Sequence, residues 1–515
     1  MGELSPPEPP SLSPSLPPSR QPSLPAPFGW RGLAALAGLA AVLVWSSSRY
    51  GYHRDELYFL ACGRRLAWGY PDQPPLTPLL ARAMELLHPH SPLVLRLPAV
   101  ALMVGVTAVT ALLARDLGGG RFAQGLAGLA VGSGTVLLLG GHVLVTATVD
   151  LAVWVGITWL AVRLLRSEDR RWWLPLGALL GIGLLNKQLP LLLAAGLVAG
   201  LLLTPSARPL LRGPWPWIGG ATAAACWAPV LLWQARHGWP QLTLAGQIRA
   251  EYGRPGERIA ALVGQLLLFG LGAGVLWIIG VRQLFRRPEL ARFRPLAWAW
   301  VVAFLLFVVT AGQVYYLAGL YPVLIAAGAA AVERWRRRRA VAMVALVVVT
   351  AALLVPSVLP VLSPSELDAS PWAALSEPQL DMVGWPALVD QVAAAYRTIP
   401  APDRARAVVF TNNYGEAGAV EEYGPARGVP VPAYSGHNGF AGWGPPPVAD
   451  GPVVVVREGD PAGSAPSRWF TGCRSAGPVV TGVRNEESRF AQVWTCTGTV
   501  GGWTAIWPQL THLAA

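Results

Sequence analysis

Three acids stand close together in the stretch from Tyr52 to Leu76, which reads YHRDELYFLACGRRLAWGYPDQPPL. Asp55 and Glu56 are adjacent, and Asp72 follows within GYPDQPPL, where prolines restrict φ and favour extended backbone. This segment could hold Asp72 in place against the other two acids. A positioned carboxylate can take the proton of an incoming hydroxyl group, so the three acids are candidate catalytic residues. Solvated carboxylates at a membrane surface are the alternative.

Arginines surround these acids. Guanidinium groups bind phosphate oxygens in bidentate fashion, which makes Arg54, Arg64 and Arg65 candidate phosphate ligands, with lipid headgroups as the alternative partner. A base within a phosphate-binding surround suits the transfer of a sugar from a polyprenyl phosphate to a hydroxyl. That reaction needs charge neutralisation at the departing phosphate but no general acid, because phosphate is already a good leaving group.

The composition indicates a polytopic membrane protein. Of the 515 residues, 53% are hydrophobic and only 13% are charged. Windows of roughly 20 residues, matched to a bilayer core of ~30 Å, predict about eleven transmembrane helices. Their expected starts lie near Gly32, Leu93, Phe122, Val149, Trp173, Leu189, Trp215, Ile259, Pro295, Val314 and Ala340.

Arginine clusters at alternate connections orient these helices by the positive-inside rule. The amino terminus is therefore expected in the cytoplasm, and everything after Pro360 outside. Residues 1–28, rich in Pro and Ser, are predicted to be a disordered cytoplasmic tail. Residues 29–362 form the predicted transmembrane domain, with a first external loop over 49–91, and residues 363–515 an external domain. The clusters lie at Arg115 and Arg121, Arg163–Arg171, Arg208 and Arg212, Arg282–Arg294, and in RWRRRR ending at Arg339.

The formal charge of +12 does not point to nucleic acid. Only 9 of the 40 basic residues lie beyond residue 360, so the positive excess belongs to the membrane portion, where orientation explains it. Membrane lipids are the expected surroundings. Within the first external loop, a helix from Asp55 to Leu66 would place Asp55 on one face with Phe59 and Cys62, and such a helix is predicted to lie along the lipid boundary.

The loop pattern RDELYFLACGRRLAWGYPDQPPL, with RLP at Arg96–Pro98, closely resembles the first external loop of bacterial dolichyl-phosphate-mannose protein mannosyltransferases. These form glycosyltransferase family 39 and belong to the C-type glycosyltransferases, alongside the aminoarabinose transferases of lipid A. Further similar stretches follow in the same order across residues 45–335. They are TVDLAVW at Thr148, GLLNKQLP at Gly183, LLWQARHGWP at Leu231 and YYLAGLYPVLIAAGA at Tyr315.

The resemblance implies a helical membrane glycosyltransferase that uses a polyprenyl-phosphate sugar donor and inverts the sugar. It implies that Asp55 is the catalytic base, Glu56 its paired acid and Asp72 a second loop acid. Tyr58, in the same motif, becomes a candidate substrate-binding residue. It also places Lys187 near the lipid phosphate, although a lone lysine at a helix end can also extend its ammonium group to the membrane surface.

Three further polar residues have open roles. Asp150 either binds substrate or favours the dipole at the start of a helix that Thr148 would cap. His237 is a candidate substrate-binding residue. A divalent metal is possible, held by His53 and His237 with Asp72, but no tight His/Asp spacing supports it.

The carboxyl-terminal part reads as a small α/β domain. The strand-like runs AVVFTN at Ala407 and GPVVVVRE at Gly451 flank GEAGAVEEYG, which reads as a helix. Nearby Tyr434, His437, Asn438 and Trp443 could bind an acceptor sugar, and turn formation explains them equally well.

Two cysteines, Cys473 and Cys496, lie in this external part, where oxidation is permitted. GPVVTGV and RFAQVW between them could pair as neighbouring strands. We expect a disulfide with Cα atoms about 4.4 to 6.8 Å apart. Cys62 and Cys226 are expected to be small packing residues.

A transporter or flippase of lipid-linked sugars is the main rival to a transferase, and a scaffold is the third candidate. A transporter would concentrate acids and broken helices near the membrane midplane and show internal repeats, whereas the acids here gather outside. The acceptor could be a protein, a glycan or a lipid.

Overall fold

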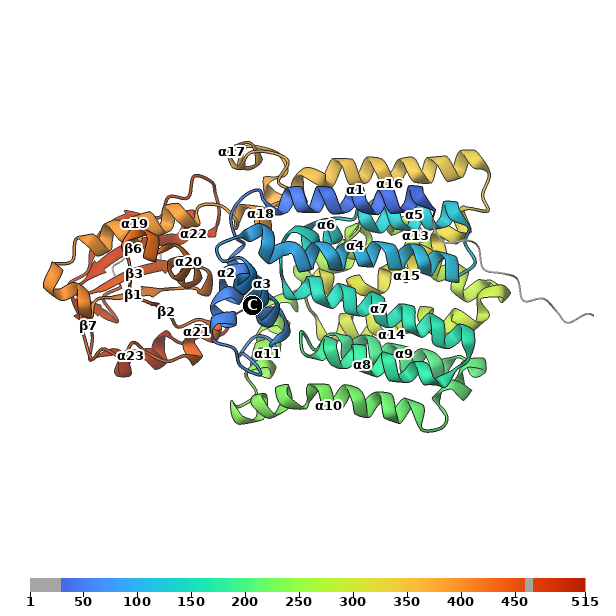
Figure 1. Ribbon diagram of the computed structural model, residues 1–515, viewed down its shortest axis with the longest axis horizontal. Coiled ribbons are helices and arrows are strands. Elements are labelled where there is room, and N and C mark those ends of the chain that lie inside the picture. Colours follow the sequence, from blue (N-terminus) through green and yellow to red (C-terminus); the bar gives the residue numbers. More distant parts are fainter. Residues whose placement is uncertain (1–28, 459–465, 515) are drawn as a thin grey trace, which may run out of the picture.

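The computed structural model describes residues 29–458 and 466–514, so the predicted tail over 1–28 lies outside the described residues. A helix bundle forms one end of the molecule and an α/β domain the other, with α2 (Arg54–Arg64) and α3 (Leu76–Leu87) between them (Figure 1). The helices of the bundle are α1 (Trp30–Ser47), α4 (Pro92–Asp116), α5 (Arg121–Gly132), α6 (Thr135–His142), α7 (Thr146–Ser167), α8 (Trp173–Leu184), α9 (Pro190–Leu203), α10 (Trp215–Arg236), α11 (Pro240–Tyr252), α12 (Pro255–Leu267), α13 (Leu271–Arg286), α14 (Arg294–Thr310), η4 (Val314–Leu320), α15 (Tyr321–Val332) and α16 (Arg337–Val358).

The predicted multi-pass helical class is confirmed, but the count of about eleven spans is not. In the part of the chain that the structure describes, six helices are long and apolar enough to cross a membrane, or up to eight if α5–α6 and α12–α13 are each one bent span. These two pairs bend by 62° and 87°. The predicted number of spans is too high because an apolar stretch of sequence does not reveal how long the helix within it is. α8 and α9 are only 12 and 14 residues long.

Small residues let the bundle helices approach closely. A Cβ atom added to Gly280 of α13 would lie 1.9 Å from the carbonyl oxygen of Leu324 in α15, and one on Gly328 would lie 2.0 Å from that of Leu276. Only glycine fits at both places. Lipid is as apolar as leucine, so close backbone packing of this kind holds membrane helices together.

The α/β domain is built on a five-stranded sheet of order β2-β1-β3-β6-β5. β1 pairs in parallel with β2 and β3, whereas β6 is antiparallel to β3 and β5. The expected strands at Ala407 and Gly451 and the helix between them are present as β1, β3 and α20. The bounds are β1 (Val408–Thr411), α20 (Tyr414–Tyr423), β2 (Ala433–Ser435), α21 (Asn438–Gly442), β3 (Val453–Glu458), β4 (Phe470–Thr471), β5 (Arg474–Pro478), α22 (Glu486–Phe490), β6 (Ala491–Cys496), β7 (Gly498–Thr499) and α23 (Trp503–Leu510).

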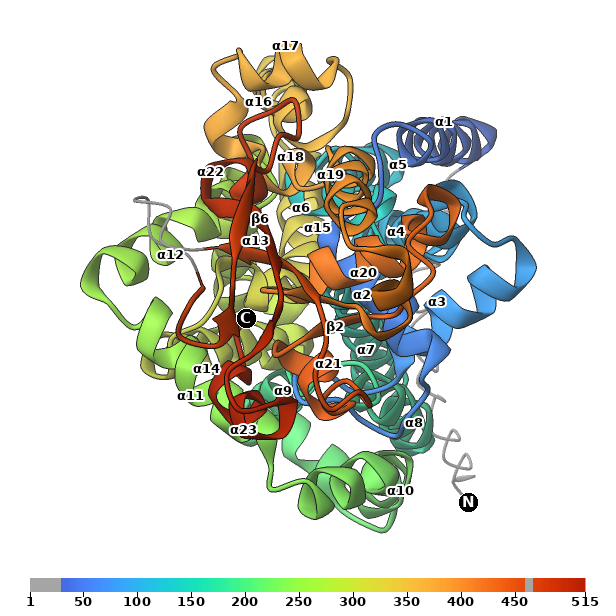
Figure 2. The same cartoon turned by 90° about the vertical axis from the view of Figure 1, so that its left-hand side faces the viewer.

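Both faces of the sheet are covered, which explains the uninterrupted valine run of β3. Val454 and Val456 pack with α19 (Trp385–Arg397) and α20, while Val453 and Val455 pack with Trp503 of α23. The first of these two apolar cores continues into α2 of the first external loop. Figure 2 shows α20 lying against α2, so the domain is seated on the loop that carries the candidate acids.

A disulfide joins Cys473 and Cys496, with Cα atoms 4.0 Å apart, slightly less than the expected range. The expected pairing of the segments between these cysteines is present in part. β5 begins directly after Cys473 and reaches Gly477 and Pro478, the first two residues of GPVVTGV, which pair with Val493 and Gln492 of β6. Cys62 is buried and Cys226 partly buried, and neither is bonded.

Candidate active site

Asp55 opens into a cavity of about 220 Å³ at the end of the bundle where α2 begins. The walls come from the start of α2, the α6–α7 junction and η4. Most of the lining is apolar, and its ionisable members are His53, Asp55, Asp150 and Tyr315. A nearly apolar cavity with a few convergent polar groups is typical of a substrate site.

The Asp55 side chain keeps 32% of its surface exposed, so its carboxylate can be reached. Its Oδ1 accepts a hydrogen bond of 2.9 Å from the hydroxyl of Tyr414. His53 caps α2, and its Nδ1 accepts the backbone N–H of Asp55 at 3.2 Å. Burial lowers the pKa of His53. The imidazole is therefore neutral and fixes the backbone at Asp55 without forming an ion pair with it.

Glu56 faces away from the cavity. Its carboxylate and the guanidinium of Arg96 are both fully buried and lie 2.7 Å apart. The same carboxylate accepts the backbone N–H groups of His53 at 2.8 Å and Leu144 at 2.9 Å. The expectation that Glu56 is a second catalytic acid is therefore at odds with the structure, in which Glu56 joins α2 to α4 and to the α6–α7 junction.

Asp72 is also separate from the cavity around Asp55. Its Oδ1 accepts a hydrogen bond of 2.7 Å from the hydroxyl of Tyr58, which in turn accepts the N–H of Gly439 at 2.9 Å. Desolvation raises the pKa of Asp72 to about 7. The prolines around Asp72 thus hold it against a buried tyrosine, and Tyr58 lies beneath α21 and does not line the cavity around Asp55.

The three arginines expected to bind phosphate are paired with acids. All three of these pairs run from α2 or its end to the α/β domain, so the arginines fasten the domain to the loop. The acids lie more than 350 residues away in the chain, where no local pattern reveals them. The pairs are Arg54 with Glu486, Arg64 with Glu422 at 2.7 Å, and Arg65 with Glu421 at 2.5 Å.

The helix predicted to lie along the lipid boundary, α2, is instead buried within the protein. α2 is mostly buried, and a Cβ atom on Gly418 of α20 would lie 2.9 Å from Leu57. The face that carries Phe59 and Cys62 packs in the protein core and not against lipid.

Asp150 and Lys187 lie together beside the cavity. Asp150 is 7% exposed, and its Oδ1 has no hydrogen-bond partner in the described residues. The expected capping is wrong, because α7 begins at Thr146 and Thr148 donates instead to the carbonyl of Gly140. The ammonium of Lys187 lies 5.1 Å from the ring centroids of both Tyr315 and Tyr316, a cation–π arrangement.

Residues 72–233 match the family model described as dolichyl-phosphate-mannose-protein mannosyltransferase. The apo structure of ArnT from Cupriavidus metallidurans superposes with a TM-score of 0.59 at 14% identity, over 90% of this chain and 98% of ArnT. The same protein bound to undecaprenyl phosphate gives 0.58 at 14% identity, over 90% and 97%. The chain has the C-type glycosyltransferase fold. The resemblance indicated by the loop motifs is thereby confirmed. No curated protein matches the sequence.

In this C-type glycosyltransferase fold, His237 lies outside the Asp55 cavity. It stacks on Trp233 at 3.9 Å and lines another cavity of about 700 Å³, together with Asn438 and Trp443. The Asn438 side chain is bonded to the backbone of Ala514, and the guanidinium of Arg65 covers the Trp443 ring at 4.4 Å. These contacts favour structural roles for both residues.

The divalent metal considered from the sequence would need several ligand side chains that lie close together in the fold. Within residues 29–458 and 466–514, no group of three or more His, Cys, Asp or Glu side chains has the arrangement of a metal site. His53 and His237 line different cavities.

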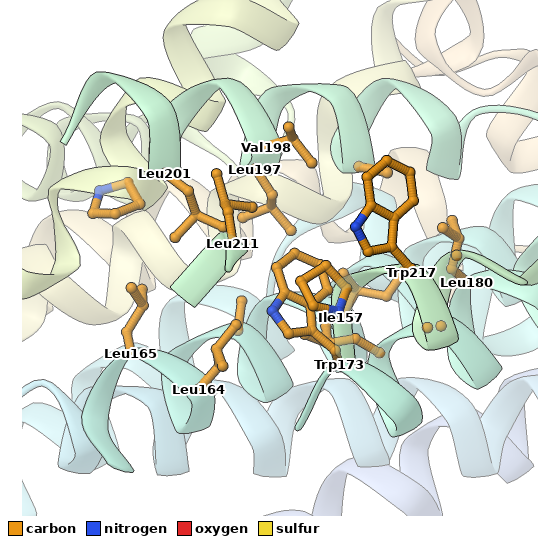
Figure 3. A pocket seen from close by; sticks show the side chains of 18 residues that line it. Ile157, Leu164, Leu165, Trp173, Leu180, Leu197, Val198, Leu201, Leu211 and Trp217 are labelled. Carbon is orange, nitrogen blue, oxygen red and sulfur yellow. The ribbon is translucent and has the colours of Figure 1, made fainter. Parts of the chain in front are cut away.

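An apolar cavity of about 450 Å³ lies between α7, α8, α9 and α10 (Figure 3). Trp173, Trp217 and Leu197 point into it, and it is lined by no titratable side chain. Ile157, the α7 residue of its wall that is nearest in sequence to Asp150, is seven residues away, which is about 10 Å along a helix. This cavity suits a hydrocarbon chain and not the chemistry at Asp55.

Sequence reasoning missed Tyr414, the residue from the α/β domain that touches Asp55. No signal in the loop could have found it, because 359 residues separate the two. It missed Arg96 as the partner of Glu56, although RLP at Arg96–Pro98 was part of the recognised pattern.

Proposed function

We propose that the chain is an inverting membrane glycosyltransferase that moves a sugar from a polyprenyl-phosphate donor to an acceptor hydroxyl at the outer face of the membrane. The observation that carries the proposal is the position of Asp55. Of the three acids between Tyr52 and Leu76, it is the one whose carboxylate opens into the cavity at the end of the bundle. The complex of ArnT with undecaprenyl phosphate supports a donor of this class.

Asp55 accepts the proton of the acceptor hydroxyl as its oxygen attacks the anomeric carbon. A carbon–oxygen bond to the acceptor forms, and the bond from the anomeric carbon to the phosphate oxygen breaks. The phosphate leaves as an anion without a proton donor. A single displacement of this kind inverts the anomeric configuration.

Lys187 and Asp150 have complementary roles in this proposal. The Lys187 ammonium, held by the faces of two tyrosines, neutralises the phosphate that departs. Asp150 has a buried oxygen without a partner on the cavity wall, and a sugar hydroxyl donating to that oxygen would satisfy it.

A donor panel tests the proposal. Purified protein is supplied with polyprenyl phosphates that carry different hexoses and pentoses, with and without a chelator, and released polyprenyl phosphate is measured. We expect release from at least one donor, dependent on an acceptor alcohol. Movement of intact labelled donor across a vesicle bilayer without release would support the flippase alternative instead.

The membrane orientation is a further proposal, with the first loop and the α/β domain outside. The backbone N–H of Gly51 donates to Met382 and the hydroxyl of Tyr50 donates to Leu362, so the carboxyl ends of α1 and α16 meet at the α/β domain. The arginine run that begins α16 then lies at the opposite end of the bundle, as the positive-inside rule favours for the cytoplasm.

In cells, a membrane-impermeant thiol reagent is expected to label Trp68→Cys in the loop but not Arg338→Cys, in a Cys226→Ser background. Trp68 is 62% exposed, and Cys62 is buried. After the membrane is permeabilised, both variants should be labelled. If Arg338→Cys were labelled in intact cells and Trp68→Cys were protected, the protein would have the opposite orientation to the one proposed.

A further inference from the structure

The α/β domain reaches the candidate base directly. Tyr414 is the first residue of α20, and its hydroxyl donates to Oδ1 of Asp55 at 2.9 Å. The other oxygen, Oδ2, makes no hydrogen bond within the described residues, and its nearest basic atom is Nδ1 of His53 at 4.0 Å. One carboxylate oxygen is therefore occupied by the domain, and the other is left to take a proton.

The Tyr414 ring is held on several sides. It stacks on Tyr58 with centroids 4.6 Å apart, and the guanidinium of Arg54 lies 5.2 Å from its centre. Its backbone is fixed by a capping box, in which Asn413 Oδ1 accepts the N–H of Glu416 at 2.9 Å and Glu416 accepts that of Asn413 at 3.1 Å. These contacts fix the Tyr414 ring in the place from which its hydroxyl reaches Asp55.

We propose that Tyr414 is a positioning residue for Asp55, through which the α/β domain completes the active site. This inference rests on the proposed function, in which Asp55 is the base. The hydroxyl fixes the rotation of the carboxylate so that Oδ2 faces the acceptor. It also stabilises the charged form of Asp55, because a hydrogen bond donated to a carboxylate favours ionisation.

Tyr414 stays a donor throughout the working pH range, since burial raises its pKa well above the ordinary value. Several other charges act on Asp55 and remain in place when Tyr414 is changed. Among them, Arg54 is paired with Glu486. The titratable and charged groups around Asp55 are His53, Arg54, Asp72, Asp150, Tyr315, Asp381, Tyr414 and Glu486.

The test is Tyr414→Phe, which removes the hydroxyl and keeps the ring. The pH dependence of carbodiimide labelling at Asp55, measured by peptide mass spectrometry against exposed Asp390, should move upward, because the carboxylate loses the hydrogen bond donated by Tyr414. The acidic limb of kcat/KM should move the same way. At neutral pH, kcat should fall about tenfold while KM for the donor changes less than about twofold.

Tyr423→Phe is the matched control. Tyr423 ends the same helix and packs against Tyr52, with no hydroxyl contact to Asp55 in the described chain. It should leave the labelling midpoint and the pH profile unchanged. Equal midpoints for the two variants would overturn the positioning role, whatever the turnover. A shifted midpoint in a protein that releases no polyprenyl phosphate from any donor would instead keep the contact and reject the proposed transferase function.

Discussion

Replacement of Asp55 by asparagine is expected to lower transfer about 10²- to 10⁴-fold, the usual cost of losing a positioned base. The amide has nearly the size of the carboxylate, and its oxygen can still accept the hydrogen bond from Tyr414. The variant should therefore fold and bind donor as the parent does. Released polyprenyl phosphate measures the first expectation, and binding of labelled donor measures the second.

Asp72→Asn is the matched control, because it makes the same change in the same loop. Asp72 is bonded to Tyr58 and does not line the cavity around Asp55. Losing part of that hydrogen bond should cost less than about tenfold in turnover. An Asp55→Asn enzyme within a few-fold of the parent would remove Asp55 as the base. Equal, large losses in both variants would mean that the loop responds as a whole and that Asp55 has no special role.

The sequence predicted features that depend on local periodicity and on composition. The apolar runs identified the bundle, and the valine-rich segments at Ala407 and Gly451 became β1 and β3 because strands buried on both faces are continuously apolar. The span count failed because apolar windows do not reveal where helices are short or bent. The 87° bend between α12 and α13 follows no proline or charge that marks a loop.

Pairings between distant segments could not be predicted. Arg64 was assigned to phosphate, whereas it pairs with Glu85 in the same loop and with Glu422, which is 358 residues away. Tyr414 lies one residue before the helix that was expected in GEAGAVEEYG, and no local pattern connects it to Asp55. Asp150 illustrates a different failure, since the helix start expected near Val149 is three residues past the observed start at Thr146. An acid in the second turn was therefore placed in the first turn, beside an apparent Thr148 cap.

Glu56→Gln is expected to lower the free energy of unfolding by about 3 to 5 kcal/mol, because it leaves the buried Arg96 guanidinium without its counter-charge. Arg96 donates to both Glu56 oxygens, at 2.8 and 2.7 Å, and to the carbonyls of Ser47 and Gly51. The network therefore joins α1, α2 and α4 at the point where Asp55 enters the cavity. Thermal unfolding in detergent should show a clear fall in Tm, with a loss of transferase activity alongside it.

Two variants separate a stranded charge from a general loss of packing. Asp390→Asn breaks an exposed pair with Arg427, in which Asp390 keeps 65% of its side-chain surface, and should cost less than about 1 kcal/mol. The double variant Glu56→Gln with Arg96→Met removes the buried cation as well, and it should regain part of the lost stability because an apolar side chain needs no counter-charge. The recovery should be incomplete, since the carbonyls of Ser47 and Gly51 lose their donor. If the double variant were less stable than Glu56→Gln alone, packing of the Arg96 side chain, and not its charge, would be what holds the three helices together.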